Sequence, residues 1–298
     1  MTASEETPIR FRVDPTNPGQ FFACCGLLEL ADRLWNGVEG WFEKDGCQFC
    51  LRPQQISANQ KIFSSTTIIN ELAACSLSNT MTVAQLARRD LLSTFPKKQM
   101  ELDSDLETEK KELDKLWRES PIVLHTPFNI LLNWFVDGRA GGSDFKTWAG
   151  QQSVIDIARG MKIPVDAGRF SLVSSNDWLR ERITNDSLPF NFDSDLGGVG
   201  SDRDVGFSFD PLKTIKVQSR PLLELFAFVG LQRFRPVRIK AENRYQFFLW
   251  LDPLGPEVAA TASCGLLASP RLKAFEFRLL YRTKYLKSFL TATPLKRS

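Results

Sequence analysis

Histidine is almost absent from this chain, which has one, His125, among 298 residues. A single histidine excludes a metal centre built from several imidazole ligands, and no nucleophile motif lies near it in the sequence. Chemistry that depends on histidine therefore has little support, although a carboxylate mechanism stays open. We expect no catalytic residue set and no cofactor, so the protein is more an assembly component than an enzyme.

Long apolar runs are also missing. No stretch approaches the roughly 18 residues that a membrane helix needs. Residues 1–7 are polar and lack the basic and apolar parts of a secretory signal. We expect a cytoplasmic protein with no membrane partner, and in that compartment its six cysteines are not expected to form disulfides.

One pair of cysteines has the spacing of zinc ligands. Cys47 and Cys50 are separated by two residues, and Cys24 with Cys25 offers a second pair. The favoured interpretation is apolar, because Cys24 and Cys25 lie in a helical apolar run, where free cysteine behaves as a small hydrophobe. We expect no metal, with zinc as the alternative.

Apolar residues make up 43% of the chain, including 23 phenylalanines, which is enough for a sizeable core. The patterns predict an α+β fold of mixed helices and antiparallel sheets with a basic, β-rich C-terminal region. A helix should begin at Asn17-Pro18, a good cap followed by a good first helical residue, and end at Asn36-Gly37. Further elements are expected as strands at 9–14, 39–42, 48–51 and 130–136 (the last also readable as a short buried helix), helices at 62–74, 83–94, 145–161 and 220–232, a hairpin of 233–240 with 245–251, and a long strand at 275–287.

Three regions follow from composition. We expect an N-terminal α+β region at residues 1–96 and a C-terminal α+β region at 121–298. Between them, residues 97–120 form a charged helical insertion or linker. The two flanking regions can equally belong to one continuous domain.

The net charge of +3 conceals an asymmetry. Residues 213–298 carry 16 Lys and Arg against 5 Asp and Glu, and the rest of the chain carries 22 against 30. A local excess of this size indicates a polyanionic partner.

The last predicted strand alternates aromatic and cationic residues. A two-residue period of this kind means one buried and one open face. The preceding hairpin repeats the basic theme, and a bulge at Pro236 would place its cations on a single face. The residues expected to bind nucleic acid here are Arg233, Arg235, Arg238, Lys240, Arg278, Arg282 and Lys284. Ordinary surface arginine is the alternative.

A second constellation lies at residues 138–153, where a glycine-rich loop leads into the helix predicted at 145–161. Arg139 and Lys146 suit phosphate, Trp148 can stack on a base, and Gln151 with Gln152 can contact base edges. The alternative is a capped helix with a buried tryptophan.

An acidic loop follows at residues 193–210. Its five aspartates resemble a calcium loop in composition only, because their spacing does not match an EF-hand. A divalent-metal site there is a weak alternative to the metal-free expectation.

Two of these stretches together carry a family resemblance. Residues 17–31, NPGQFFACCGLLELA, are similar to the opening of a family of CRISPR-associated proteins from type I-U (I-G) loci, and residues 146–153, KTWAGQQS, resemble a second signature of that family. Residues 204–208 and 249–254 fit it less specifically. The resemblance spans most of the chain except the charged insertion.

The resemblance implies a subunit of a Cascade-type effector complex, large-subunit-like or RAMP-like, that acts in antiviral defence. Its partners would be CRISPR RNA, target DNA or both, together with other Cascade-type subunits. It supplies no catalytic residue set to carry over. The alternatives are a repeat-RNA-processing endoribonuclease that uses His125 or Tyr281 with a lysine, or uses the acidic loop with a metal, and a scaffold that touches only protein.

Overall fold

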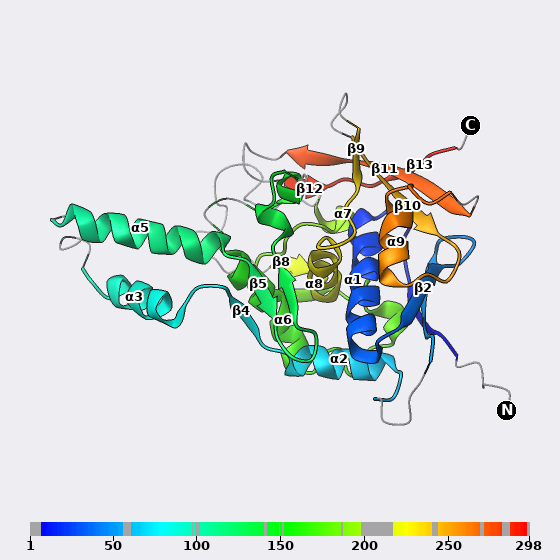
Figure 1. Cartoon of the computed structure of the whole chain (residues 1–298), viewed down its shortest axis with the longest axis horizontal. Helices are drawn as coiled ribbons and strands as arrows, with labels where there is room; N and C mark the ends of the chain where they lie inside the picture. The colour runs from blue at the N-terminus through cyan, green and yellow to red at the C-terminus, as the bar shows by residue number, and fades with distance from the viewer. Residues whose placement is uncertain are drawn as a thin grey trace.

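The computed structural model describes residues 7–55, 61–96, 98, 102–139, 142–148, 150, 152–185, 187–197, 217–239, 244–268, 271–281 and 287–296. It confirms the α+β fold (Figure 1). The helices are α1 (Pro18–Trp35), α2 (Ser65–Ala74), α3 (Val83–Ser93), α5 (Ser104–Glu119), α6 (Val154–Asp166), α7 (Ser194–Gly197), α8 (Pro221–Gly230) and α9 (Pro256–Ser263), with 3-10 turns at Trp134–Val136, Gly142–Phe145 and Ser175–Asp177.

The strands form small antiparallel sheets. They are β1 (Ile9–Arg12), β2 (Val38–Phe42), β3 (Gln48–Pro53), β4 (Leu77–Asn79), β5 (Ile122–Leu124), β6 (Ile130–Leu132), β7 (Ile183–Asn185), β8 (Val217–Ser219), β9 (Val237–Ile239), β10 (Arg244–Trp250), β11 (Leu272–Tyr281), β12 (Lys287–Phe289) and β13 (Thr293–Pro294). The sheet orders are β1-β3-β2, β4-β5-β6, β7-β8 and β12-β11-β10-β9, with β13 on β11. We call the last of these the upper sheet, since it lies uppermost in Figure 1.

Helix α1 forms where the sequence predicts it and is almost entirely buried. The Asn17 side chain accepts the Gln20 N–H at 3.3 Å, Pro18 occupies the first turn, and Asn36 ends the helix in a left-handed conformation. The backbone N–H of Asn36 donates to the carbonyl of Asp32. These local signals fix both ends of the helix, so their prediction is confirmed.

Helices α8 and α1 pack so closely that their backbones are in contact. A methyl group at Gly26 would lie 2.0 Å from the carbonyl oxygen of Phe226, and one at Gly230 would lie 2.1 Å from that of Phe22. No side chain fits at either point, so glycine is what allows the two helices to touch.

The upper sheet covers this helix pair with an aromatic face. Phe21 stacks on Phe247 with ring centroids 4.3 Å apart, and Phe22 meets Phe277 edge-on at 6.4 Å. One apolar core contains residues from Phe11 to Ala292, so both flanking regions contribute to it. The alternation predicted for the last strand is confirmed where Phe275, Phe277 and Leu279 are buried.

Helices α3 and α5 form an arm that projects from the body (Figure 1). They share a small core around Leu92 and Leu113, and Arg88 pairs with both carboxylate oxygens of Glu109, at 2.8 and 2.7 Å. The charged segment is thus an exposed helix over Ser104–Glu119.

Two predicted elements are wrong in extent. The helix expected from residue 145 begins at Val154, because Ser153 caps it, and residues 146–148 run beside the upper sheet instead. The strand expected over 275–287 ends at Tyr281, and Lys287 pairs directly with Tyr281 in antiparallel register. Residues 282–286, which contain no glycine, proline, asparagine or aspartate, lie outside the described residues.

Candidate nucleic-acid interface

The two basic constellations of the sequence meet at one end of the upper sheet, where β10 begins and β11 ends. The backbone N–H of Lys287, at the start of β12, donates to the carbonyl of Thr147 at 3.1 Å. The Lys287 ammonium donates to the carbonyl of Asp144 at 3.0 Å, and Phe145 packs edge-on against Tyr245 of β10 at 4.8 Å. Segment 142–148 is thereby attached to β10 and β12, a hundred or more residues away along the chain.

Three cations, Lys146, Arg238 and Lys287, lie near one another and near Asp144 at this end of the sheet. Arg238 of β9 pairs with Asp144, with 3.0 Å between Nη1 and Oδ2. Burial lowers the pKa of Lys287; Asp144 opposes that shift, whereas the nearby charges of Arg238 and Lys146 add to it. We call Lys146, Arg238 and Lys287 around Asp144 the Asp144 cluster. Its cations exceed its carboxylate, so it can accept a further anion such as a phosphate.

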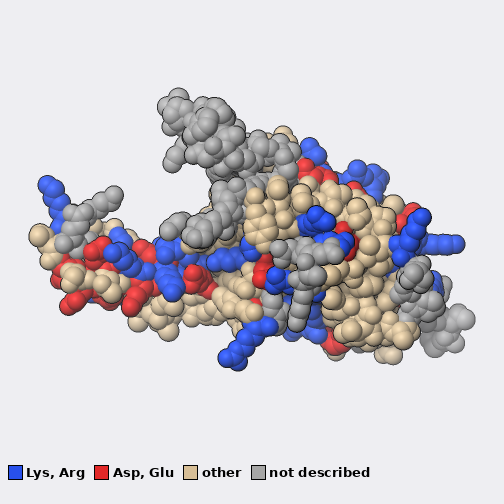
Figure 2. All heavy atoms as spheres, turned by 90° about the horizontal axis from the view of Figure 1, so that it is seen from above, with Lys and Arg blue, Asp and Glu red and all other residues tan. Residues whose placement is uncertain are grey.

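The face of the molecule above the upper sheet has the same charge bias. In Figure 2 blue side chains predominate over red across the body on this face, whereas both colours alternate along the arm. On the arm the charges are largely paired, as in Arg89–Asp114 at 3.0 Å and Lys111–Glu107 at 2.6 Å. The excess of positive charge thus belongs to the body.

Buried residues hold segment 142–148 in place. Gly142 lies against the backbone of Trp134, where a methyl group would come within 2.0 Å of the carbonyl oxygen. Phe145 and Trp148 are 3% and 1% exposed. The polar side chains of the segment are therefore displayed by an anchored backbone, which reduces the entropy lost when a ligand binds.

Trp148 is a core residue. Its indole meets Trp134 at 5.9 Å and Phe190 at 5.2 Å, both edge-on. Of the two alternatives that the sequence left open, the structure has the buried tryptophan, so base stacking on Trp148 is ruled out in this conformation. The sequence could not reveal this, because the covering aromatic residues come from distant segments.

The hairpin arginines do not form one basic face. Arg233 pairs with Glu29 of α1 at 2.7 Å, and Arg235 pairs with Asp137 at 3.0 Å. Arg238 lies across from Tyr245, whereas Arg278 lies across from Arg244, so Arg238 and Arg278 point to opposite sides of the sheet. The expectation of a single basic face is wrong, because ion pairs and strand register distribute these side chains differently.

Of the remaining predicted residues, three are described by the structure and four are not. Arg139 and Arg278 are exposed, and neither has an ion-pair partner among the described residues. Gln152 is half-buried beside the cap of α6. Four predicted contacts lie outside the described residues, namely Gln151, Lys240, Arg282 and Lys284.

The acidic loop contributes a buried ion pair. Asp193 is 1% exposed and receives Arg220 Nη1 at 3.0 Å on both oxygens and Asn17 Nδ2 at 2.7 Å. Arg220 also pairs with Asp195 at 2.7 Å. We call Asn17, Asp193, Asp195 and Arg220 the Asp193 cluster. It joins the cap of α1 to the start of α8, so these aspartates hold the fold together.

Glu224 lies beside this cluster. Its two carboxylate oxygens accept the backbone N–H groups of Phe192 and Asp193, at 3.2 and 3.1 Å. Burial, together with the neighbouring charge of Asp193, raises the pKa of Glu224 to about 8. Burial also raises the pKa of Asp193, which Arg220 and Asn17 oppose.

The described residues contain no group of three or more side chains placed to hold a metal ion. Cys24 and Cys25 are buried in α1, and Cys50 lies near Glu43, where burial raises the pKa of its thiol to about 11. A thiol that resists deprotonation is a poor zinc ligand. Cys24 and Cys25 thus follow the apolar interpretation, whereas Cys47 is exposed.

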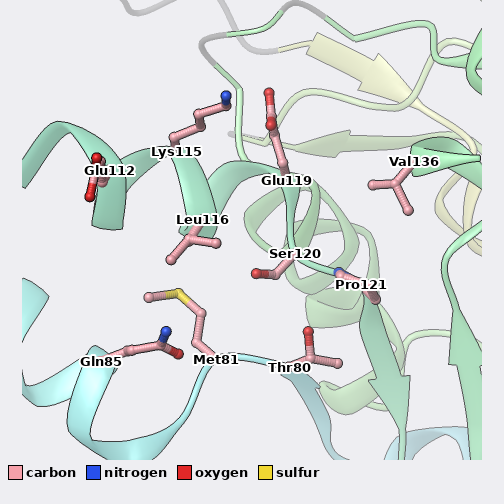
Figure 3. A pocket seen from close by; sticks show the side chains of 10 residues that line it. All are labelled: Thr80, Met81, Gln85, Glu112, Lys115, Leu116, Glu119, Ser120, Pro121 and Val136. Atoms are coloured by element: carbon pink, nitrogen blue, oxygen red, sulfur yellow. The ribbon is translucent and has the colours of Figure 1, made fainter.

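A hollow of about 700 Å³ lies where the arm leaves the body. Met81 and Leu116 face each other across it, with Lys115, Glu119 and Val136 on its rim (Figure 3). Its lining mixes aliphatic groups with single charges and includes no residue of the Asp144 cluster.

Sequence reasoning missed two members of the cluster. Asp144 lies in the predicted glycine-rich loop but was given no role there. Lys287 was expected at the end of a long strand, whereas that strand ends at Tyr281 and Lys287 begins β12. No local signal marks either residue, because the contact between residues 144 and 287 depends on tertiary structure alone.

No helix in the described part of the chain has the length and apolarity needed to cross a membrane. Comparisons with protein-family models, with curated proteins and with solved structures find no match.

Proposed function

We propose that this chain is a non-catalytic subunit of a CRISPR type I-U (I-G) RNA-guided effector complex and that it binds nucleic acid at the Asp144 cluster. The observation that carries the proposal is the convergence of Lys146, Arg238 and Lys287, from three separate segments, beside Asp144. Cations that exceed their acidic partners at an anchored edge suit a phosphate backbone.

The family resemblance supports the same proposal through the places of its two blocks. Residues 17–31 form most of α1, the central buried helix, and residues 146–153 begin at the cluster and end at the cap of α6. One block thus builds the core and the other displays Lys146.

The proposed partners are CRISPR RNA, target DNA or both, with other Cascade-type subunits, in the cytoplasm and in antiviral defence. In RNA-guided systems base pairing reads the sequence, while protein contacts hold the backbone; this comes from a different, single-protein effector and serves here as an analogy. Phosphate contacts without base selection are what the cluster offers.

A repeat-RNA-processing nuclease remains the second candidate, for one reason. Tyr281 and Lys287 lie side by side, with the ammonium 5.4 Å from the ring centroid, and burial lowers the pKa of Lys287. The other nuclease candidate, His125, lies between β5 and β6 with its Nε2 2.7 Å from the Ser78 hydroxyl. A cleavage assay on repeat RNA, with and without magnesium, separates the two functions. Specific cleavage lost in Lys287→Ala or His125→Ala would favour the nuclease.

The test of binding is the salt dependence of affinity. The logarithm of the binding constant should fall linearly with the logarithm of salt concentration, because each neutralised phosphate releases about one counterion. Replacing Lys146, Arg238 and Lys287 together by alanine should reduce this slope by about two to three. Fluorescence anisotropy with a labelled 20-nucleotide RNA measures it.

The matched control removes three cations from the arm, Lys110, Lys111 and Lys115, and should leave the slope unchanged. Equal losses in both triple variants would mean that binding is a property of total charge, and an unchanged slope in the cluster variant would place the nucleic acid elsewhere. Co-purification of small RNA and other subunits with a tagged chain tests the assembly itself.

A further inference from the structure

One exposed aromatic side chain stands beside the Asp144 cluster. Tyr281, at the end of β11, is 53% exposed. Every other large apolar side chain that is exposed in the described part of the chain is aliphatic. An aromatic ring in solvent next to an excess of cations is the pair of features that single-stranded nucleic acid uses.

Strand geometry explains why this ring points outwards. Phe277 and Leu279 lie on the same face of β11 as Tyr281, and both are buried against the aromatic core. Tyr281 continues that face beyond Arg278, the last β11 residue that β10 covers. The core therefore ends one step before Tyr281, and the ring emerges on the side where the Asp144 cluster lies.

Lys287 links the ring to the cluster. It is the direct cross-strand partner of Tyr281, and its ammonium lies 5.4 Å from the ring centroid while donating to the Asp144 carbonyl. A base stacked on Tyr281 would thus have a phosphate-binding cation beside it. Arg238 of β9 and Lys146 of segment 142–148 add further positive charge near Lys287.

We propose that Tyr281 stacks on an unpaired base of a single-stranded nucleic acid whose backbone crosses Lys287, Arg238 and Lys146. This inference rests on the proposed function and narrows it, because a duplex hides its base faces and a single strand presents them. The ligand is an unpaired segment of RNA or of DNA, and both present the same stacking face.

The experiment compares Tyr281→Ala with Tyr281→Phe in the full chain. The probes are a 20-nucleotide uridine RNA, a 20-nucleotide thymidine DNA and a 20-base-pair DNA duplex. Tyr281→Ala should weaken binding of the single strands by about 5- to 150-fold, the range for one stacked base. Tyr281→Phe keeps the ring and should stay within about twofold of the wild type. The preferred strand tells RNA from DNA.

Two readouts distinguish stacking from charge. Tyr281→Ala should leave the salt slope unchanged and the duplex affinity intact, since it removes no cation. A wild-type chain that binds none of the probes would overturn the proposed function and this inference together. Salt-dependent binding with equal affinities for Tyr281→Ala and wild type would overturn this inference alone.

A direct measurement on the unaltered protein completes the test. Uridine RNA carrying 5-iodouracil, irradiated in complex with the wild-type chain, should crosslink at Tyr281 and be located there by mass spectrometry. Crosslinks confined to other residues would contradict the stacking role, whatever the variants show.

Discussion

Two aspartates of this chain gather cations from distant segments, and their surroundings differ. Asp193 is buried and shares Arg220 with Asp195 beneath the first turn of α1. Asp144 lies at the end of the upper sheet where β11 finishes, pairs with Arg238, and has Lys146 and Lys287 nearby. The first cluster has no cation beyond its carboxylates and holds the fold together. The second has cations in excess, so the balance of charge around an aspartate, more than the aspartate itself, separates a structural role from a binding one.

Removing Trp148 should have the largest effect, because this residue anchors the backbone that carries the Asp144 cluster. Trp148→Ala empties a site packed by Trp134 and Phe190 and should lower the free energy of unfolding by about 3–5 kcal/mol. Urea denaturation followed by circular dichroism measures it. Unchanged stability with weakened RNA binding would instead make the tryptophan a surface contact and break the comparison.

Asp193→Ala should rank next. It leaves the Arg220 guanidinium buried with only Asp195 as a carboxylate partner, so we expect a loss of about 3 kcal/mol, the lower end for a broken buried pair. Nucleic-acid binding by the folded fraction should not change. Asp195→Ala is the control, because this more exposed carboxylate should cost less. A stable Asp193→Ala protein with altered RNA affinity would mean that the Asp193 cluster is also a binding site.

The pH dependence of stability should reveal the ionisation of the Glu224 carboxyl group. Its pKa of about 8 in the folded state exceeds its ordinary value of 4.5, so the folded protein holds this proton more tightly than the unfolded chain does. The resulting stabilisation is complete at low pH, and it should be lost as pH rises towards 8, by at most about 1.4 kcal/mol per pH unit.

Denaturation curves at intervals between about pH 5 and about pH 8 measure this slope. Glu224→Gln cannot ionise and should flatten it, whereas Glu257→Gln, at an exposed position, should leave it in place. A slope that survives in Glu224→Gln would assign the titration to another group.

Asp144→Ala should have the smallest effect on stability, and it should strengthen nucleic-acid binding. Its pair with Arg238 is partly exposed, so the free energy of unfolding should change by less than about 1 kcal/mol. RNA affinity should rise and its salt slope should steepen by about one, since the Asp144 cluster loses its one negative charge. Asp252→Ala, which breaks the surface pair with Arg271, is the matched control. Weaker binding in Asp144→Ala would mean that the carboxylate positions its cations.

Local signals made the N-terminal half of the fold predictable. The cap at Asn17, the stop at Asn36 and the pair of Glu29 with Arg33 at 3.1 Å each depend on residues within one or two helical turns. The turn at Asp45-Gly46 is of the same kind, because Gly46 has a φ of +84° that glycine adopts readily. Features of this kind depend on short stretches of sequence and can be predicted from them.

The candidate site was predictable only in part. Lys146 and Arg238 were expected from local composition, but Asp144 and Lys287 enter through contacts that span more than 90 residues. Arg233 was removed from the expected basic face by Glu29, some 200 residues earlier. Charge counts predict that a region is basic, whereas the partner of each cation depends on the assembled fold.

The contact between Gly26 and Gly230 has a consequence for how the protein is made. Helix α1 leaves the ribosome early, yet α8 and the aromatic face of the upper sheet come from the last third of the chain. At about 5–20 residues per second, the apolar surface of α1 waits roughly 10–40 s for its partners. During that time Phe21, Phe22 and Leu27 are open to chaperones and to neighbouring nascent chains. Production of the folded protein should therefore respond to translation speed and chaperone supply more strongly than its final stability would suggest.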